Sequence, residues 1–72
     1  MSGSNLWEVH FYAPAETRPA SNEKFAGFEA ALQFALTLKH DRPSGWHVHV
    51  HPPIHADARE IATLQEHALY PG

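Results

Sequence analysis

Hydrophobic and polar residues alternate without interruption over residues 45–51. One side of this stretch carries tryptophan and valine and the other carries histidine: Trp46, Val48 and Val50 against His47, His49 and His51. A repeat of two residues is the repeat of a β-strand, because successive side chains of a strand point to opposite faces. The pattern therefore predicts a strand with one buried face and one histidine-bearing face.

A second alternating stretch covers residues 6–13. Its apolar and polar sets are Trp7, Val9, Phe11 and Ala13 against Glu8, His10 and Tyr12. This pattern predicts a first strand with the same two-sided character, and both tryptophans are in phase with the valines, so we expect both in the core. Pro14 ends the stretch, and residues 14–22 are rich in turn formers. We expect a mobile loop there.

The segment from about residue 22 to residue 39 has the composition and spacing of a helix. Asn22 or Ser21 is a suitable N-cap, and Glu23 would lie favourably in the first turn. At 100° per residue an apolar stripe forms from Phe25, Phe28, Leu32, Ala35 and Leu36, widened by Ala31, Phe34 and Leu38. Such a wide arc exceeds what one small sheet covers. We expect the flank around Phe34 and Leu38 to meet either the C-terminal helix or another protein.

A second helix is predicted from Asp57, as its cap or first-turn residue, to about Leu69. Pro52-Pro53 ends the preceding strand, since proline cannot donate to a strand ladder. The helix carries a narrow apolar stripe made of Ile61, Leu64 and Ala68.

The predicted order is therefore β-α-β-α in one small α+β domain spanning residues 1–72, with a flexible start at residues 1–5. A strand, a long helix and another strand form a crossover unit, so the two strands are expected to be parallel and the connection right-handed. A two-stranded sheet packed on a long amphipathic helix, with a short C-terminal helix, leaves two unpaired edges. We expect a protein partner or a second copy of the chain to complete it.

Composition excludes several classes of function. The chain has five Lys/Arg against eight Asp/Glu, a net charge of −3, and its basic residues are scattered, which argues against direct nucleic-acid binding. There is no cysteine, which suits a reducing compartment. The sequence shows neither a signal peptide nor an apolar run of about 20 residues that could span a membrane. We therefore expect a cytoplasmic protein.

The histidines allow a metal site as an alternative. Side chains two residues apart on one strand face can converge on one ion, so His47, His49 and His51, with His10 from the first strand, could bind zinc. Glu8 or Tyr12 could orient such ligands. The competing interpretation is that the three histidines simply form the solvent-facing side of a half-buried sheet.

No catalytic arrangement is visible. The serines and threonines carry no nucleophile motif, and the chain has no glycine-rich phosphate loop and no carboxylate pair at a useful spacing. We expect a non-enzymatic protein with no cofactor, a regulator that occupies a surface of a larger protein. Small acidic inhibitors of host machines such as RNA polymerase, encoded by phages or mobile elements, are one such class. The candidate contact residues are His10, Tyr12, His47, His49, His51, Phe34 and Leu38.

The closing residues 66–72, with His51-Pro52 upstream, are faintly similar to the last motif of the small DOPA-dioxygenase-like proteins. The spacing differs, the chain is shorter and the rest of the sequence does not follow that family. We therefore assign no family and no function from this similarity.

Overall fold

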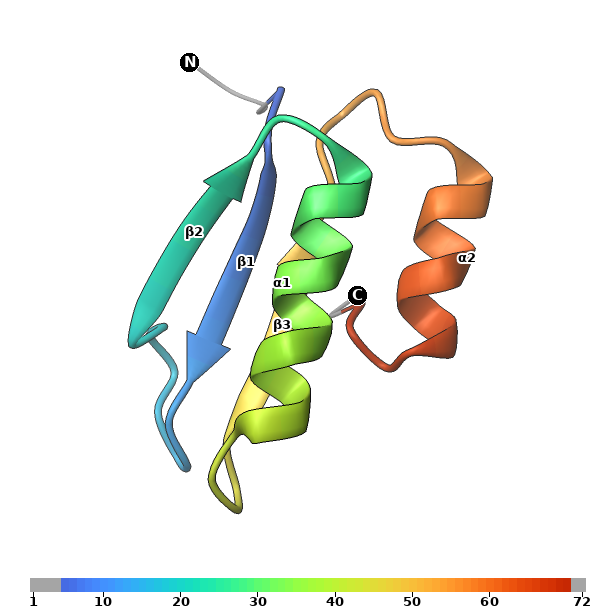
Figure 1. Cartoon of the computed structure of the whole chain (residues 1–72). Helices are drawn as coiled ribbons and strands as arrows, with labels where there is room; N and C mark the ends of the chain where they lie inside the picture. Colours follow the sequence, from blue (N-terminus) through green and yellow to red (C-terminus); the bar gives the residue numbers. More distant parts are fainter. Residues whose placement is uncertain (1–4, 71–72) are drawn as a thin grey trace.

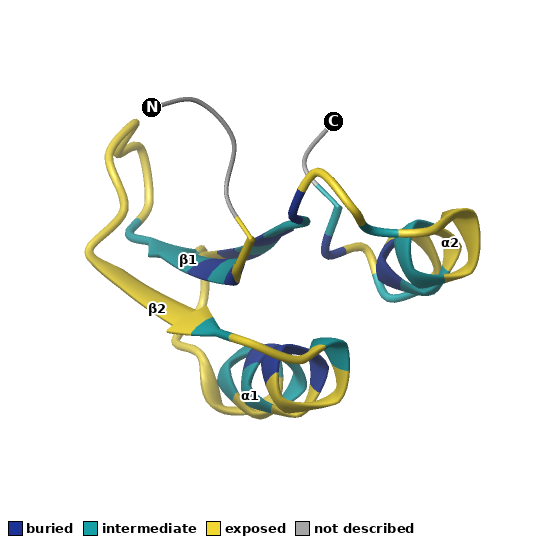
Figure 2. Cartoon of the chain, turned by 90° about the horizontal axis from the view of Figure 1, so that it is seen from above, coloured by how far each residue is buried: buried dark blue, intermediate teal, exposed yellow. Residues whose placement is uncertain are grey.

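The computed structural model of the chain describes residues 5–70. Along the chain lie β1 (Trp7–Tyr12), β2 (Ser21–Phe25), α1 (Phe28–Asp41), β3 (His47–His51) and α2 (Ala58–Glu66) (Figure 1). The strands form one antiparallel sheet in the order β2-β1-β3. α1 packs on one face of this sheet, and α2 lies beside β3 (Figure 2). The α+β class is confirmed, but the sheet has three strands instead of two.

The strand that the sequence pattern did not predict is β2. Its residues Ser21–Phe25 are polar and exposed except for Phe25, so they lack the alternation that identified the other two strands. An edge strand needs little burial of its own, and charged residues such as Glu23 and Lys24 protect an exposed edge from pairing with other chains. Pairing with β1 over five register positions, Trp7↔Phe25 to Phe11↔Ser21, overrides their weak strand propensity.

The prediction of parallel strands is wrong for the same reason. β1 and β3 are antiparallel, with Val9 opposite Val50 and Phe11 opposite Val48. The chain returns along β2 before it enters α1, and this extra reversal inverts the direction in which β3 runs beside β1. The crossover through the helix instead links β2 to β3, which are parallel to each other and lie on either side of β1.

The start of α1 also differs from the prediction. Asn22 and Glu23 lie in β2. The helix begins at Phe28, and its N-cap residue is Gly27, which has no side chain to cap the first turn. The residues expected in the first turn are good caps and helix formers in isolation. Strand pairing outweighs these local preferences, which are worth only a few tenths of a kcal/mol to about 1 kcal/mol each.

The core lies between the sheet and the two helices. Its buried members come from every element except β2, together with the C-terminal turn: Trp7, Val9, Ala31, Leu32, Ala35, Val48, Val50, Leu64 and Leu69. Trp7 packs on Phe28 with ring centroids 4.9 Å apart. Trp46 is only partly buried, because it precedes β3 at the end of the sheet and packs on Phe11 at 4.7 Å.

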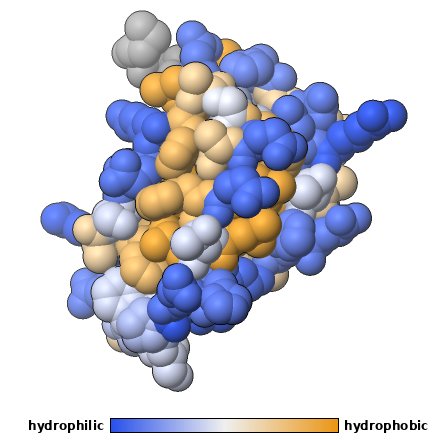
Figure 3. Space-filling view, in the orientation of Figure 1, coloured by the Kyte–Doolittle hydropathy of each residue, from blue (hydrophilic) through white to orange (hydrophobic). Residues whose placement is uncertain are grey.

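β2 explains the wide apolar arc of α1. Phe34 lies 5.2 Å from Phe25 of β2, measured between ring centroids, and both side chains are partly buried against the core, as is Leu38. The flank therefore meets a third strand of its own sheet instead of the C-terminal helix. Partial burial still leaves an apolar zone on the side of the molecule that α1 occupies (Figure 3).

α2 begins where the sequence predicted and ends earlier. The Asp57 side chain accepts a hydrogen bond from the Glu60 backbone N–H, and the Glu60 carboxylate accepts one from the Asp57 N–H, forming a capping box. At the other end Ala68 has a φ of 58°, and Leu69 N–H donates to Leu64 carbonyl at 2.8 Å. This is a Schellman turn, which stops the helix at Glu66 and turns Leu69 back into the core.

Within residues 5–70, no helix is long and apolar enough to cross a membrane. Of the expected flexible start at residues 1–5, the first four lie outside the described residues. The expected mobility of residues 14–22 stays a prediction, although its last two residues belong to β2.

The left-handed backbone at Ala68 gives a test of the α2 terminus. Replacing Ala68 by glycine removes the steric penalty of a Cβ at positive φ, so we expect Ala68→Gly to raise the free energy of unfolding by about 0.5–1 kcal/mol. The matched control, Ala62→Gly at an exposed position inside α2, should lower it by about 1 kcal/mol. Urea unfolding measures both. If both substitutions changed the free energy of unfolding in the same direction, the result would contradict the Schellman turn.

The contact between β2 and α1 can be measured by a double-mutant cycle. We expect Phe25→Ala and Phe34→Ala to couple by about 0.5–1.5 kcal/mol in the free energy of unfolding, because their rings pack on each other. A cycle between Phe34→Ala and Phe28→Ala is the control, since Phe28 packs on Trp7. Equal coupling in the two cycles would show that β2 does not cover this flank.

Candidate functional site

The face of the sheet opposite α1 gathers most of the residues singled out by the sequence. The β1–β3 register places Glu8 opposite His51, His10 opposite His49 and Tyr12 opposite His47. We call these six residues the histidine face. Figure 2 shows α1 on the other side of the sheet and α2 beyond the edge, so neither helix covers this face.

His10 is the centre of a hydrogen-bonded chain along β1. Its Nε2 lies 3.0 Å from the Glu8 carboxylate, and its Nδ1 lies 3.3 Å from the Tyr12 hydroxyl. A neutral imidazole has one donor and one acceptor nitrogen. Since a carboxylate can only accept, Nε2–H donates to Glu8. In the neutral ring Nδ1 then accepts from the Tyr12 O–H. Both nitrogens of His10 are thus occupied and its ring orientation is fixed.

The other rings pack on this chain from β3. His51 lies against His10 with ring centroids 4.1 Å apart, and Tyr12 lies 5.1 Å from His49. His47 is 6.4 Å from His49 and is exposed. The face is therefore a continuous layer of aromatic rings, partly buried among themselves at His10, His49 and His51 and open to solvent at His47.

Burial and neighbouring imidazoles disfavour protonation of two histidines. Burial lowers the pKa of His49, with smaller contributions from His47 and His10. Burial also lowers the pKa of His51, assisted by His10 and His49 and opposed by Glu8. Since an ordinary histidine has a pKa of about 6.5, both rings are mainly neutral at pH 7.

Glu8 is the negative charge of this layer. The hydrogen bond from His10 lowers the pKa of Glu8 despite the opposing effect of burial, and nearby Lys24 of β2 acts in the same direction as His10. The histidine face thus combines two histidines whose protonation is disfavoured, His49 and His51, with a carboxylate whose ionised form is favoured.

The predicted metal site is not assembled in the described part of the chain, where no group of three histidine or carboxylate donors could hold an ion. The geometry gives two reasons. Both nitrogens of His10 are engaged by Glu8 and Tyr12, and the His51 ring packs directly against the His10 ring, with centroids 4.1 Å apart. The His51 Nε2 is buried with no hydrogen-bond partner among the described residues.

Phe34 and Leu38 do not join the histidine face. They lie on α1, on the opposite side of the sheet, partly buried against the core. The sequence did not single out Lys39 and Arg42, which line a groove at the outer edge of β3. Their position in and just after the last turn of α1 would have been the only signal, and cations at a helix C-terminus are usually explained by the helix dipole.

Comparisons with protein families, with curated proteins and with solved structures find no match to this chain. Functional inference therefore depends on the geometry of the site.

The lowered pKa values of His49 and His51 make the fold sensitive to acid. A histidine whose pKa is lower in the folded than in the unfolded state binds fewer protons when folded, so its contribution to stability is complete above about pH 6.5 and is lost as the pH falls through the lowered pKa. We expect the urea midpoint to fall between pH 7.5 and pH 5.5, and His49→Gln with His51→Gln to flatten this dependence. His55→Gln, at an exposed loop position, is the control. If the urea midpoint of the double variant depended on pH as that of the wild type does, the acid sensitivity would not come from His49 and His51.

Proposed function

We propose that this protein is a non-enzymatic regulator that binds a larger protein through the histidine face. The observation that carries the proposal is the combination of an uncovered sheet face with rings that are already ordered. An antiparallel sheet commonly leaves one face in water, and such faces usually carry long charged side chains. This one carries four imidazoles and a tyrosine instead.

The chemistry of these side chains favours burial against protein. Interface cores are depleted in lysine and glutamate and enriched in aromatic residues, because desolvating a full charge is expensive. Neutral imidazoles and tyrosine lose less on desolvation and keep polar atoms for specific hydrogen bonds. Glu8 supplies a hydrogen-bond acceptor on the same surface.

Order in the free state also favours binding. A flexible side chain loses about 0.5–1.5 kcal/mol of entropy when an interface immobilises it. His10 is held from both nitrogens, and His51 and His49 are held by ring contacts, so a partner finds much of the surface already fixed.

A small acidic regulator of this kind could act as an inhibitor of a large assembly, and RNA polymerase is the example that we propose to test first. Support for this narrower proposal comes from the size of the chain and its net charge of −3, which suit occupation of a protein surface better than direct binding of nucleic acid.

The test is capture of a partner by a chain carrying a tag other than polyhistidine, followed by binding measurements with the purified partner, with RNA polymerase included from the start. We expect Tyr12→Ala and His49→Ala each to weaken binding at least tenfold, since these two rings pack on each other and His49 belongs to the middle pair of the face. Affinity should also fall as the pH drops below about 6.5 and through the lowered pKa values of His49 and His51.

The matched control is Gln33→Ala, an exposed residue on the far side of α1. It should bind like the wild type. A partner lost with Gln33→Ala but retained by the two face variants would disprove the histidine face as the contact, as would an affinity that is flat over this pH range. Failure to bind RNA polymerase alone would remove only the narrower proposal.

A further inference from the structure

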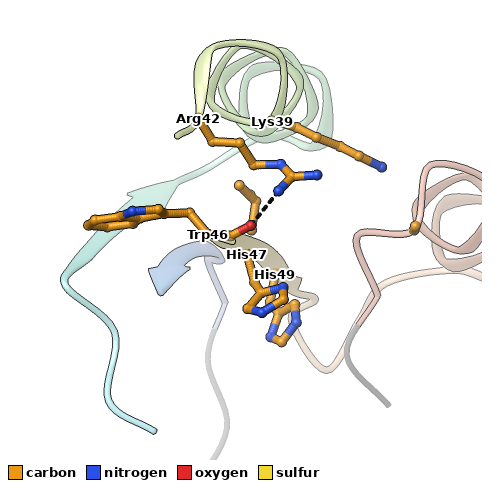
Figure 4. A pocket seen from close by; sticks show the side chains of 7 residues that line it. Lys39, Arg42, Trp46, His47 and His49 are labelled. Carbon is orange, nitrogen blue, oxygen red and sulfur yellow. Dashed lines mark hydrogen bonds between the residues drawn. The ribbon is translucent and has the colours of Figure 1, made fainter. Parts of the chain in front are cut away.

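A groove of roughly 210 Å³ runs along the outer edge of β3. It is bounded by the end of α1, by β3 and by the turn after α2, with lining residues Lys39, Arg42, Trp46, His47, Val48, His49 and Ala68. In Figure 4 Lys39 and Arg42 descend from α1 toward the groove, whereas the rings of His47 and His49 point away from α1. The cations and the imidazoles therefore lie on opposite sides of β3.

The strand edge in this groove is only partly paired. The Val50 N–H donates to the Leu69 carbonyl at 2.8 Å, so the C-terminal turn already pairs with one position of the outer edge. Alternate residues of a strand direct their N–H groups to the same side, so the Val48 N–H points outward as well. No backbone partner for it lies within residues 5–70. The Val48 position of the edge is thus available for pairing, next to the Val50 position that Leu69 already occupies.

The two cations at the groove have no acidic partner in the described structure. Within residues 5–70 the ion-pair contacts are His10 with Glu8 and His40 with Asp41. Lys39 donates to the His67 carbonyl, and Arg42 donates to the Trp46 carbonyl. Each of these bonds uses one N–H, and lysine has three and arginine five, so both side chains keep donors for another ligand.

We propose that this groove binds an extended acidic segment of a partner protein, which pairs with β3 at Val48 and places a carboxylate between Lys39 and Arg42. Lys39 and Arg42 both extend over the groove from the end of α1 (Figure 4), so one carboxylate can contact both cations. Addition of a strand to an exposed edge supplies backbone hydrogen bonds, and the two cations select for acidic side chains. The inference goes beyond the histidine face and does not depend on it.

A second copy of the chain is a poorer occupant. Two-fold pairing of β3 with β3 would bring the Lys39 and Arg42 side chains of both copies to the same seam, where like charges repel. The Leu69 carbonyl also occupies the Val50 position in each copy, which leaves a short stretch of edge for two chains to share.

The probe is a capped six-residue peptide in which glutamate alternates with threonine, titrated into the wild-type protein labelled with ¹⁵N. We expect the Val48 amide signal to shift and its hydrogen exchange to slow, because the peptide carbonyl covers it. Replacing glutamate by glutamine, or methylating the central peptide nitrogens, should each weaken binding at least tenfold. Arg42→Gln should do the same, and Arg42→Lys should retain most of the affinity.

Several results would overturn the proposal. The first two are binding of the glutamine peptide, or of the methylated peptide, as tight as that of the glutamate peptide. The others are NMR signal shifts confined to the histidine face and no binding at millimolar peptide. Protection of the Val48 amide that grows with protein concentration in the absence of peptide would assign the edge to a second copy. The peptide comparisons use the wild-type chain, so they decide the matter even if Arg42→Gln does not fold. Loss of partner binding in Tyr12→Ala, with peptide binding intact, would separate this site from the histidine face.

Discussion

β1 is the strand on which the rest of the molecule depends, because it is paired along both edges and has a different environment on each face. β2 and β3 both run antiparallel to it, and the two parallel outer strands are connected by α1. Its apolar face supplies Trp7 and Val9 to the core, and its polar face supplies the Glu8–His10–Tyr12 chain. The alternation of apolar and polar residues along β1 thus fixes both the face on which α1 packs and the face that carries the candidate binding surface.

The antiparallel arrangement separates stability from recognition. α1 buries one side of the sheet and α2 adds Leu64 to the same core, and the buried residues there are all hydrophobic within the described chain. Neither helix covers the opposite side, where partly buried imidazoles order one another. The separation is incomplete, because the burial that fixes His49 and His51 also lowers their pKa values. Acid therefore acts on the fold and on the proposed contact through the same two rings.

The parts of the fold that the sequence predicts are those governed by strong local signals. Alternation located β1 and β3, and the Asp57–Glu60 capping box located the start of α2. β2 has no such signal, because an exposed edge strand such as Ser21–Phe25 is specified by its neighbour, and missing it reversed the predicted strand direction. The histidine face followed from periodicity alone. The hydrogen bonds of His10 and the packing of His51 on its ring depend on register and rotamers, which the sequence of one strand cannot reveal.

The groove beside β3 could not be predicted for a different reason. It requires three segments distant in sequence to meet: the last turn of α1, the edge of β3 and the Schellman turn after α2. The turn matters most, since its reversal at Ala68 brings the Leu69 carbonyl onto Val50 and ends the pairing there. A helix continuing to Leu69, as the sequence suggested, would take that carbonyl into the helix instead. The end of α2 therefore decides how much of the β3 edge the chain pairs for itself, and the Lys39 bond to the His67 carbonyl anchors the end of α1 to the same turn.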